Sequence, residues 1–175
     1  MNCITLTEPW ATLVAIGAKT IETRSWPAPR SAIGQPLAIH AAKGMAGDDL
    51  DWLAETPAAR QALAVVECRC WPNCWPAAGY PRPAVKDAFA ATRGRVLATC
   101  RLVASEPMPR FAYQDKRLWT PATGDIELSD DELAFGNFER HRWAWVLRDV
   151  VALPEPAPAR GALGIWQWTQ QGVAR

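Results

Sequence analysis

The sequence GAKTIETRSW, residues 17–26, places three ionisable side chains at the start of a predicted strand. Gly17 is a typical helix terminator, and in the strand that follows it Glu22 and Arg24 share one face, roughly 7 Å apart. Lys19 stands at the turn itself, where the alternation of a strand need not hold. The three groups either form an exposed, ion-paired strand of little energetic consequence or face a ligand together. They are therefore the first candidates for a functional site.

A helix and two strands frame this segment. Apolar residues spaced as in a helix predict an α-helix over residues 7–17, with Thr7 as its N-cap. Alternation predicts a strand over residues 20–26, which Pro27 ends. A second strand is predicted over residues 37–42, after a Gly-Gln-Pro turn. The charged residues therefore fall at and within the first of these strands.

The rest of the chain mixes helical and strand patterns without regular alternation. Two stretches, 68–93 and 105–127, have little periodicity, and we expect irregular loops or insertions there. Ser129 and Glu132 have the spacing of a capping box, which predicts the start of a helical turn. The remaining expected elements are helices within residues 44–66, a strand over 95–103, a strand over 142–153 followed by a Pro-Ala-rich turn, and a strand near 163–168.

This order of elements predicts an α+β fold rather than a doubly wound one. Several strands follow one another without intervening helices, which favours a small barrel or a strongly curved sheet with flanking helices. A chain of 175 residues, 49% of them apolar, has the size of one domain with a substantial core. No repeat or linker divides it, so we expect a single domain over residues 1–175.

The charge balance excludes a strong overall field. Lys and Arg number 19 and Asp and Glu number 18, so any anionic partner has to be met by a local patch. The first residues lack the basic region of a signal peptide, and no apolar run approaches the ~20 residues that span a bilayer. The sequence therefore predicts a cytoplasmic protein that does not use a membrane, and it leaves the oligomeric state open.

A cysteine cluster is the one candidate metal site in the sequence. Cys68, Cys70 and Cys74 lie within one short stretch, but no fourth Cys or His stands near them, and structural zinc usually has four ligands. Five cysteines, an odd number, fit reduced thiols better than a disulfide framework. Walker-type loops, dinucleotide fingerprints and nucleophile turns are missing from the sequence as well. We therefore expect neither a metal nor a cofactor.

Polar residues outside the charged segment add weaker candidates. His40 and Lys43 follow the second predicted strand, where His40 is either an acid or base near neutral pH or a structural hydrogen-bonding group. Residues 140–142, Arg-His-Arg, form a local basic spot that either holds a phosphate or is a solvated loop. Arg142 lies closest to the strand that follows.

Tryptophan is unusually frequent, with 10 residues in 175. Trp10 and Trp26 flank the charged segment and are the better candidates for stacking on a ligand. Six other tryptophans come in local pairs that are either stacking platforms or parts of the core, at positions 71 and 75, 143 and 145, and 166 and 168.

Several blocks of the sequence closely resemble the ASCH domain family. The first covers residues 6–26, with the pattern Gly-x-Lys-x-x-Glu-x-Arg, and the second covers residues 37–43. Residues 136–138, 143–147 and 161–166 look like the closing blocks of the same family. Together these blocks span nearly the whole chain in the order of the family.

The resemblance implies a fold and a class of ligand. The fold is that of the PUA-like superfamily, a small β-barrel with flanking helices. The cleft would be lined by the Gly-x-Lys-x-x-Glu-x-Arg segment, and its ligand would be RNA or a modified nucleoside or nucleotide.

The resemblance also implies two possible activities. Some small bacterial members resemble amidohydrolases acting on N4-acetylcytidine, and others are associated with nuclease activity. The amidohydrolases carry Lys at the position matching Lys19, Thr at the position matching Glu22, and a further Glu. This chain therefore has a carboxylate where those relatives have a hydroxyl.

Three hypotheses follow for the function. In a binding module, Lys19 and Arg24 would meet phosphate or carbonyl oxygens while Glu22 accepts hydrogen bonds from a base. In a hydrolase, an amidohydrolase or a ribonuclease, Lys19 and Glu22 would be the reactive pair, supported by His40. A protein-interaction domain with an unused cleft is the third. The residues predicted to contact a ligand are Trp10, Lys19, Glu22, Arg24, Trp26, Lys43 and Arg142.

Overall fold

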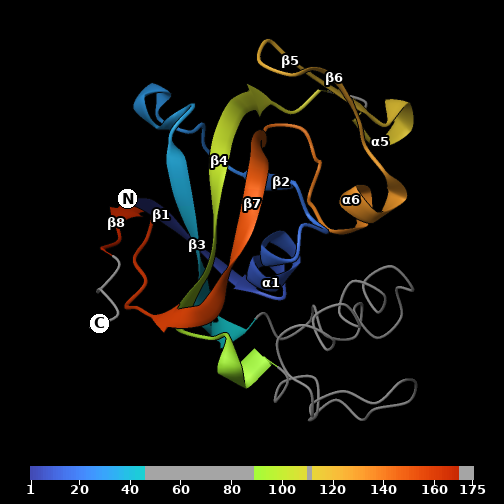
Figure 1. The fold of residues 1–175 in the computed structure, drawn as a ribbon. Helices are drawn as coiled ribbons and strands as arrows, with labels where there is room; N and C mark the ends of the chain where they lie inside the picture. Colours follow the sequence, from blue (N-terminus) through green and yellow to red (C-terminus); the bar gives the residue numbers. More distant parts are fainter. Residues whose placement is uncertain (46–88, 110–111, 170–175) are drawn as a thin grey trace, which may run out of the picture.

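The computed structural model of the chain describes residues 1–45, 89–109 and 112–169. A six-stranded sheet in the order β2-β7-β4-β3-β1-β8 forms its body (Figure 1). All neighbouring strands are antiparallel except β1 and β3, which are parallel. The strands are β1 (Asn2–Glu8), β2 (Ile21–Arg24), β3 (Pro36–Met45), β4 (Arg95–Pro107), β7 (Trp143–Pro158) and β8 (Ile165–Gln167).

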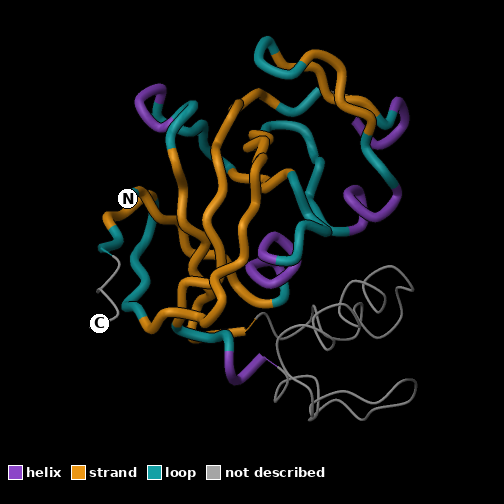
Figure 2. Tube along the Cα trace, in the orientation of Figure 1, coloured by secondary structure: helices purple, strands orange, loops and turns teal. Residues whose placement is uncertain are grey.

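The described sheet is mixed and open. Its edge strands β2 and β8 are not paired with each other, so the described residues form no closed barrel. This corrects the barrel predicted from the sequence, whereas the combination of a sheet with few helices agrees with the predicted α+β class (Figure 2). Register shifts between β3 and β4 and between β4 and β7 introduce bulges, which increase the local twist. The sheet is consequently strongly coiled.

The curl brings the edge strand β2 next to β1. Arg24 Nη2, from β2, donates a hydrogen bond of 3.0 Å to the carbonyl oxygen of Thr5 in β1. In the sheet order these two strands are separated by β7, β4 and β3. A side chain therefore joins two strands that the backbone ladder leaves apart.

Strand β7 is longer than predicted, because the Pro-Ala-rich stretch belongs to it. The pairing with β4 skips from Ala152, opposite Ala98, to Ala157, opposite Val96. Proline has no N–H for the ladder, and the skipped residues include two of the prolines. The predicted turn is thus an irregularity within a strand.

The stretch 105–127, predicted to be an irregular loop, contains regular structure. Strand β4 extends to Pro107, and it is followed by α5 (Ala112–Asp115) and by a hairpin of β5 (Arg117–Thr120) and β6 (Gly124–Glu127). In β5 the second and fourth residues are buried and the others are exposed. One apolar face on two four-residue strands is too short a signal to stand out in a polar sequence.

The helix near the N-terminus starts later than predicted. Helix α1 spans Trp10–Ala15 with Pro9 at its N-cap position, and Thr7 is part of β1 instead. The buried carboxylate of Glu8 accepts hydrogen bonds from the backbone N–H and the hydroxyl of Thr12. Glu8, one residue after the predicted N-cap Thr7, thus supplies the side-chain acceptor for the first turn of the helix.

Other short elements complete the fold. Helix α6 (Asp130–Ala134) is capped by Ser129, whose Oγ accepts from the backbone N–H of Glu132, as the capping-box spacing predicts. Two 3₁₀ turns cover Arg30–Ala32 and Phe89–Ala91. The helices expected within residues 44–66 lie outside the described residues, apart from the first two positions, which are strand. Most of the loop expected over 68–93 also lies outside.

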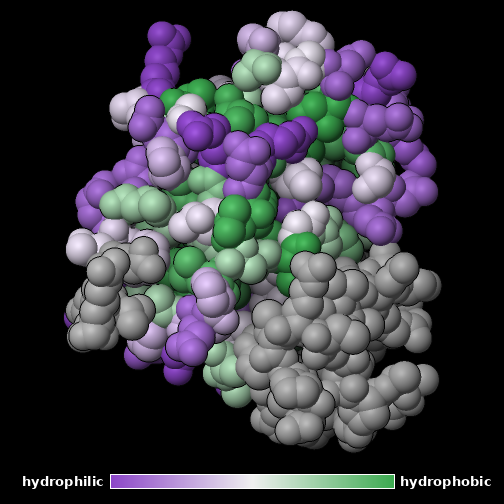
Figure 3. Space-filling model, in the orientation of Figure 1, coloured by the Kyte–Doolittle hydropathy of each residue, from purple (hydrophilic) through white to green (hydrophobic). Residues whose placement is uncertain are grey.

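Two of the hydrophobic clusters among the described residues pack against β7. The larger packs α1 against the sheet and contains Trp145 and Leu147 of β7, both fully buried. The smaller lies under the hairpin and joins Leu118, Phe138 and Val146. Hydrophobic residues also reach the surface over β4 and β7 on one face (Figure 3), and β7 carries the exposed Val151. None of the helices that the structure describes has the length and apolar character of a membrane-spanning segment.

Candidate functional site

A pocket of about 490 Å³ opens beside β2, and we call it the β2 pocket. Its volume lies within the ~300–1,000 Å³ of small-molecule sites. Its walls come from α1, from β2, and from the segment between α6 and β7. It is lined by Trp10, Lys19, Glu22, Thr23, Arg24, Ser25, Trp26, Ala134, Phe135, Gly136, Asn137 and Arg142. The structure thus brings together six of the residues predicted from the sequence: Trp10, Lys19, Glu22, Arg24, Trp26 and Arg142.

Lys19 is held by the end of α1. Gly17 has φ +78°, a conformation that favours glycine, and the backbone N–H groups of Ala18 and Lys19 both donate to the carbonyl oxygen of Leu13. This turn directs the Lys19 side chain inward, where it is only 1% exposed. Its Nζ donates to the carbonyl oxygen of Ile21.

The Lys19 ammonium is poorly solvated. Burial lowers the pKa of Lys19 from its ordinary value, and the nearby carboxylates of Glu22 and Glu132 offset part of that effect. Nζ lies 4.0 Å from Glu22 Oε2, at the limit of an ion pair. An amine with a lowered pKa in a pocket is a candidate base or nucleophile, since its free electron pair is available nearer to neutral pH.

Glu22 and Arg24 form a partly buried ion pair on one face of β2. Arg24 Nε lies 3.2 Å from Glu22 Oε1, without the alignment of a hydrogen bond. The side chains are 21% exposed for Arg24 and 12% exposed for Glu22, so water screens the pair only weakly. The Arg24 guanidinium carbon also lies 6.0 Å from the ring centroid of Trp145. The pair therefore presents a carboxylate and a fixed cation to the same pocket.

The opposite wall comes from residues more than a hundred positions away. Arg142 Nη2 donates to the carbonyl oxygen of Thr23 at 2.9 Å, and the backbone N–H of Asn137 donates to Thr23 Oγ1 at 3.2 Å. Arg142 Nε is buried and has no hydrogen-bond partner among the described residues. At Gly136 a Cβ atom would lie 2.5 Å from the ring of Phe138, so a larger residue would displace this wall.

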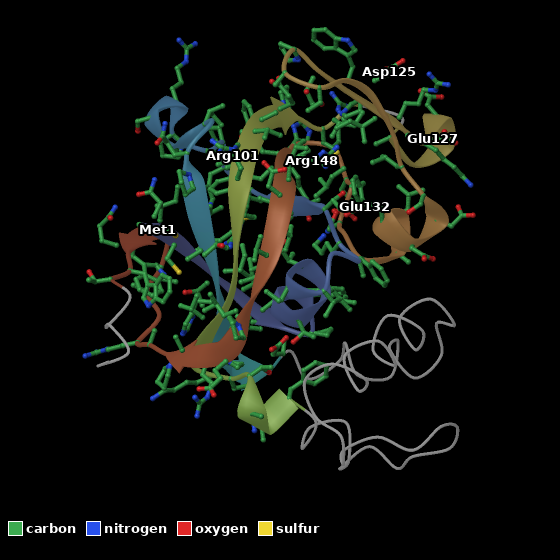
Figure 4. The ribbon with its side chains drawn as sticks, viewed as in Figure 1. Met1, Arg101, Asp125, Glu127, Glu132 and Arg148 are labelled. Atoms are coloured by element: carbon green, nitrogen blue, oxygen red, sulfur yellow. The ribbon has the colours of Figure 1, made fainter. Side chains whose placement is uncertain are left out.

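Glu132 fixes the geometry between the two walls, and the sequence did not indicate this role. From α6 its carboxylate accepts three hydrogen bonds, from the N–H and hydroxyl of Thr20 and from the N–H of Ile21, at 2.8–3.0 Å (Figure 4). The capping-box spacing identified Glu132 only as part of its own helix. Its carboxylate instead holds the residues just before and at the start of β2, which no local pattern reveals.

The structure separates His40 and Lys43 from this pocket. They lie in a second pocket of about 990 Å³, which we call the His40 pocket. Arg24 lines both pockets. The His40 pocket is lined by Thr5, Thr7, Arg24, His40, Ala42, Lys43, Gly94, Pro158, Ala159, Arg160, Gly161, Ala162, Leu163 and Gly164. The predicted catalytic set of Lys19, Glu22 and His40 is therefore not assembled in one cavity.

His40 is a buried histidine at the floor of the second pocket. Its ring is 1% exposed, its Nε2 lies 3.2 Å from the carbonyl oxygen of Ala159, and Trp166 packs edge-on against it at 5.5 Å between ring centroids. Burial lowers the pKa of His40, and the contact with Ala159 opposes that effect. These contacts agree with the structural alternative, a hydrogen-bonding histidine within the fold.

The tryptophans divide between core and pocket. Trp145 is fully buried, which excludes it as an open stacking platform, and it donates from Nε1 to the carbonyl oxygen of Trp26. Trp26 is half-buried and meets the Trp145 ring edge-on at 4.8 Å. Trp26 and Trp10 line the β2 pocket, as the sequence predicted. The pair at positions 71 and 75 lies outside the described residues.

No group of three metal-ligating side chains occurs within the described ranges. The cluster of Cys68, Cys70 and Cys74 lies outside them, so it stays a prediction that this cluster binds no metal. Cys3 and Cys100 are described, and both are free thiols in the interior. Burial raises the pKa of each to about 12, which makes them poor nucleophiles.

Comparison with models of protein families agrees with the resemblance noted in the sequence. The model of the ASCH domain family matches residues 4–79, which confirms the predicted family resemblance. Among solved structures, the chain is similar to the crystal structure of a mutant ASCH protein from Zymomonas mobilis. The identity is 13%, the match covers 97% of this chain and 90% of that chain, and the TM-score is 0.45. No curated protein matches the chain.

Proposed function

We propose that this chain, whose residues 4–79 match the ASCH domain family, binds RNA or a nucleotide in the β2 pocket. One observation carries the proposal: two tryptophans, a Glu–Arg pair and a second arginine line a single cavity of about 490 Å³. A base needs a flat apolar surface and polar groups at its edge, and a phosphate needs cations. The β2 pocket offers all three kinds of group.

Three of the lining residues have distinct roles in this binding mode. Glu22 accepts hydrogen bonds from the amino or imino groups of a base, and Trp26, half-buried at the rim, packs against its face. Arg142 supplies the donor for a phosphate or carbonyl oxygen. Its buried Nε has no partner among the described residues, and such a group is costly to leave unbonded. A ligand oxygen would remove that cost.

The charges of the pocket favour an anionic ligand. Among its described lining residues, Lys19, Arg24 and Arg142 are basic and Glu22 is acidic, which gives +2 from three positive and one negative group. If Lys19 is neutral, because its pKa is lowered by burial, the sum is still +1. The whole chain is almost neutral, with a net charge of +1, so this attraction is local.

Substitution of Arg142 tests the proposal. Purified protein is titrated with a panel of nucleosides, modified nucleosides, nucleotides and short RNAs, and binding is followed by tryptophan fluorescence and calorimetry. Arg142→Ala is expected to weaken the bound members by about 1.5–3 kcal/mol, the contribution of a charged hydrogen bond. The matched control is Arg148→Ala, in strand β7, which begins directly after Arg142, but outside the pocket lining. Equal affinity of wild type and Arg142→Ala for every member, or no binding at all, would refute the proposal.

A hydrolase is the second candidate, and the buried Lys19 is the observation that favours it. Its lowered pKa leaves a larger fraction of the amine unprotonated, and the Glu22 carboxylate, 4.0 Å away, offsets part of that shift. In this mechanism Lys19 acts as base or nucleophile on the acyl group of a modified nucleoside, or as base in RNA cleavage. His40 has no part in it, since it lies in the other pocket.

Substitution of Lys19 distinguishes a pocket that only binds from one that catalyses a reaction. If the pocket is catalytic, Lys19→Ala lowers turnover by roughly 10²–10⁴ while the substrate still binds, because a proton-transfer group acts mainly in the transition state. If the pocket only binds, wild type leaves every acylated nucleoside and RNA intact. Chromatography of the reaction products distinguishes the two outcomes. We expect binding without turnover.

A further inference from the structure

The His40 pocket has a chemistry of its own. Its described lining includes three basic side chains, Arg24, Lys43 and Arg160, and no acidic one. At about 990 Å³ it is also larger than the β2 pocket. A basic cavity with hydroxyl and backbone groups on its walls is suited to an anion with several oxygens.

We infer that the His40 pocket binds the sugar and phosphate of a second nucleotide, so that the ligand is a single-stranded RNA of at least two nucleotides rather than a free mononucleotide. The inference rests on the proposed function of the β2 pocket. The base of one nucleotide occupies the β2 pocket, Arg24 binds the phosphate that follows, and the chain continues between Lys43 and Arg160.

Arg24 lies between the two pockets and lines both of them. Its Nε faces Glu22 in the β2 pocket, while its Nη2 donates to the carbonyl oxygen of Thr5, a residue that lines the His40 pocket. These two contacts, both within the described part of the chain, engage two of the three guanidinium nitrogens. Arginine carries five N–H donors in one plane, so it can hold its neighbours and a phosphate oxygen together.

The walls of the His40 pocket are built for close approach. Thr5 and Thr7 point to the same face of β1, one hydroxyl being bonded to Trp166 Nε1 and the other exposed. Gly161 lies so near His40 that a Cβ would be 2.5 Å from its Cε1. The loop backbone therefore closes over the ring, and the ring forms a neutral floor instead of a charged contact.

The rim supplies the remaining groups. Lys43 is exposed and extends over Gly94, where a Cβ would lie 3.2 Å from its Cγ. Arg160 and Leu163 are exposed on the opposite loop, and Leu163 is 99% exposed. Cations on both sides with an apolar residue beside them form the type of groove that follows a single-stranded backbone.

Ligand length and paired substitutions test the inference. Affinities are measured by calorimetry for a nucleoside monophosphate, the corresponding dinucleotide and a hexanucleotide, at several salt concentrations. The dinucleotide is expected to bind wild type at least tenfold more tightly than the monophosphate. The double variant Lys43→Ala/Arg160→Ala should remove most of this gain, and it should leave the monophosphate unaffected. Because the double variant lacks two cations that bind phosphate, its salt slope should fall by about 1.4, each such cation on a single strand adding roughly 0.7.

The controls distinguish failure of this inference from failure of the proposed function. Arg101→Ala/Arg148→Ala removes two cations outside both pockets and should change no affinity beyond a general salt effect. Equal binding of monophosphate and dinucleotide, with Arg142→Ala still weakening both, would overturn this inference alone. Oligonucleotide binding that depends on Lys43 and Arg160 but not on Arg142 would overturn the proposed function of the β2 pocket. Absence of any binding would overturn both.

Discussion

At Lys19 the fold buries an ionisable amine almost completely, so that the residue is only 1% exposed. The side chain donates a hydrogen bond to the carbonyl oxygen of Ile21, and the Glu22 carboxylate lies at the limit of an ion pair. Such a group is costly in the folded state and is more typical of a functional site than of a stabilising contact. Its effect on stability can therefore be separated from its effect on binding.

We expect the stability contribution of Lys19 to depend on pH in a defined direction. Its folded pKa is lowered below 10.5, so between these two values the unfolded chain binds one proton more than the folded chain. Stability then rises with pH across that window and is lowest below the folded pKa. Relative to Lys19→Met, wild type should gain free energy of unfolding as the pH increases.

Urea denaturation at intervals from about pH 6 to about pH 10 measures this difference. Lys116→Met serves as the control, since its ammonium is about half exposed and is paired with Asp130. The difference in free energy of unfolding between wild type and Lys116→Met should not rise with pH. Parallel curves for wild type and Lys19→Met would show that Lys19 has the same pKa in both states.

The residues of the site were predictable where they are close in sequence. Trp10, Lys19, Glu22 and Arg24 lie within one helix, turn and strand, so local periodicity places them together. Arg142 was a candidate only as part of a local basic spot, and Glu132 only as part of a capping box. Both reach the pocket through tertiary packing, which no local pattern predicts. His40 lies in the other pocket because β3 is separated from β2 by two strands, and adjacent blocks in a sequence need not be adjacent in a sheet.

Helix α6 acts as a clamp on the start of β2. Its five residues are too few to be stable alone, yet Glu132 accepts three hydrogen bonds from Thr20 and Ile21. Glu132→Ala leaves two backbone N–H groups and a hydroxyl without these bonds. We expect a loss of about 2–4 kcal/mol in the free energy of unfolding and a lower affinity of the β2 pocket for its ligand.

Variants of the same helix separate the clamp from ordinary helix stability. Ser129→Ala removes only the N-cap and should cost about 0.5–2 kcal/mol, with little change in ligand affinity. Asp131→Ala, on the exposed side of the first turn, should cost less still. Denaturant titrations and ligand titrations on the three proteins give the comparison. A loss for Glu132→Ala no larger than that for Ser129→Ala would contradict the clamp.

Elements with a strong local signal were predicted well, and weak ones were not. The capping box identified α6, and continuous apolar runs identified β4 and the first part of β7. The hairpin of β5 and β6 escaped detection because its short strands bury few side chains, and the helix start was placed too early because β1 runs on to Glu8. In both places tertiary packing decides between alternatives that the sequence leaves nearly equal.

At the scale of the molecule, Arg24 joins the edge strand β2 to β1 by a side-chain hydrogen bond across the curled sheet. Arg101 offers a matched comparison, because it too donates to one backbone carbonyl, that of Gly34, and faces one carboxylate, that of Asp149. The difference is burial: the Arg101 side chain is 51% exposed and that of Arg24 is 21% exposed. Identical substitutions at the two sites therefore isolate the effect of the environment.

We expect Arg24→Gln to destabilise the fold by about 2–4 kcal/mol, since it leaves the Glu22 carboxylate partly buried without its cation. Arg101→Gln should cost no more than about 1 kcal/mol. Hydrogen exchange should also show faster opening of β1 and β2 in Arg24→Gln, with β4 little affected. Equal losses at the two positions would mean that the contact with Thr5 does not hold the curl.

The overall class was predictable where the detailed architecture was not. Composition and the irregular order of elements indicated an α+β domain, and the residues of β1, β2 and β3 carried the family resemblance. A sheet closes into a barrel only if its two edge strands pair with each other. In the described sheet those edges, β2 and β8, stay unpaired, and a single arginine reaches across to β1 instead.

The two walls of the β2 pocket could change independently of each other in evolution. The wall of α1 and β2 lies within residues 4–79, which the model of the ASCH family matches, while the wall of residues 134–142 lies beyond that match. A descendant of this chain could exchange the second wall by a few substitutions or an insertion and still inherit the first intact. Relatives with the same Gly-x-Lys-x-x-Glu-x-Arg motif would then prefer different ligands. The sequence differences responsible would lie in the segment after α6.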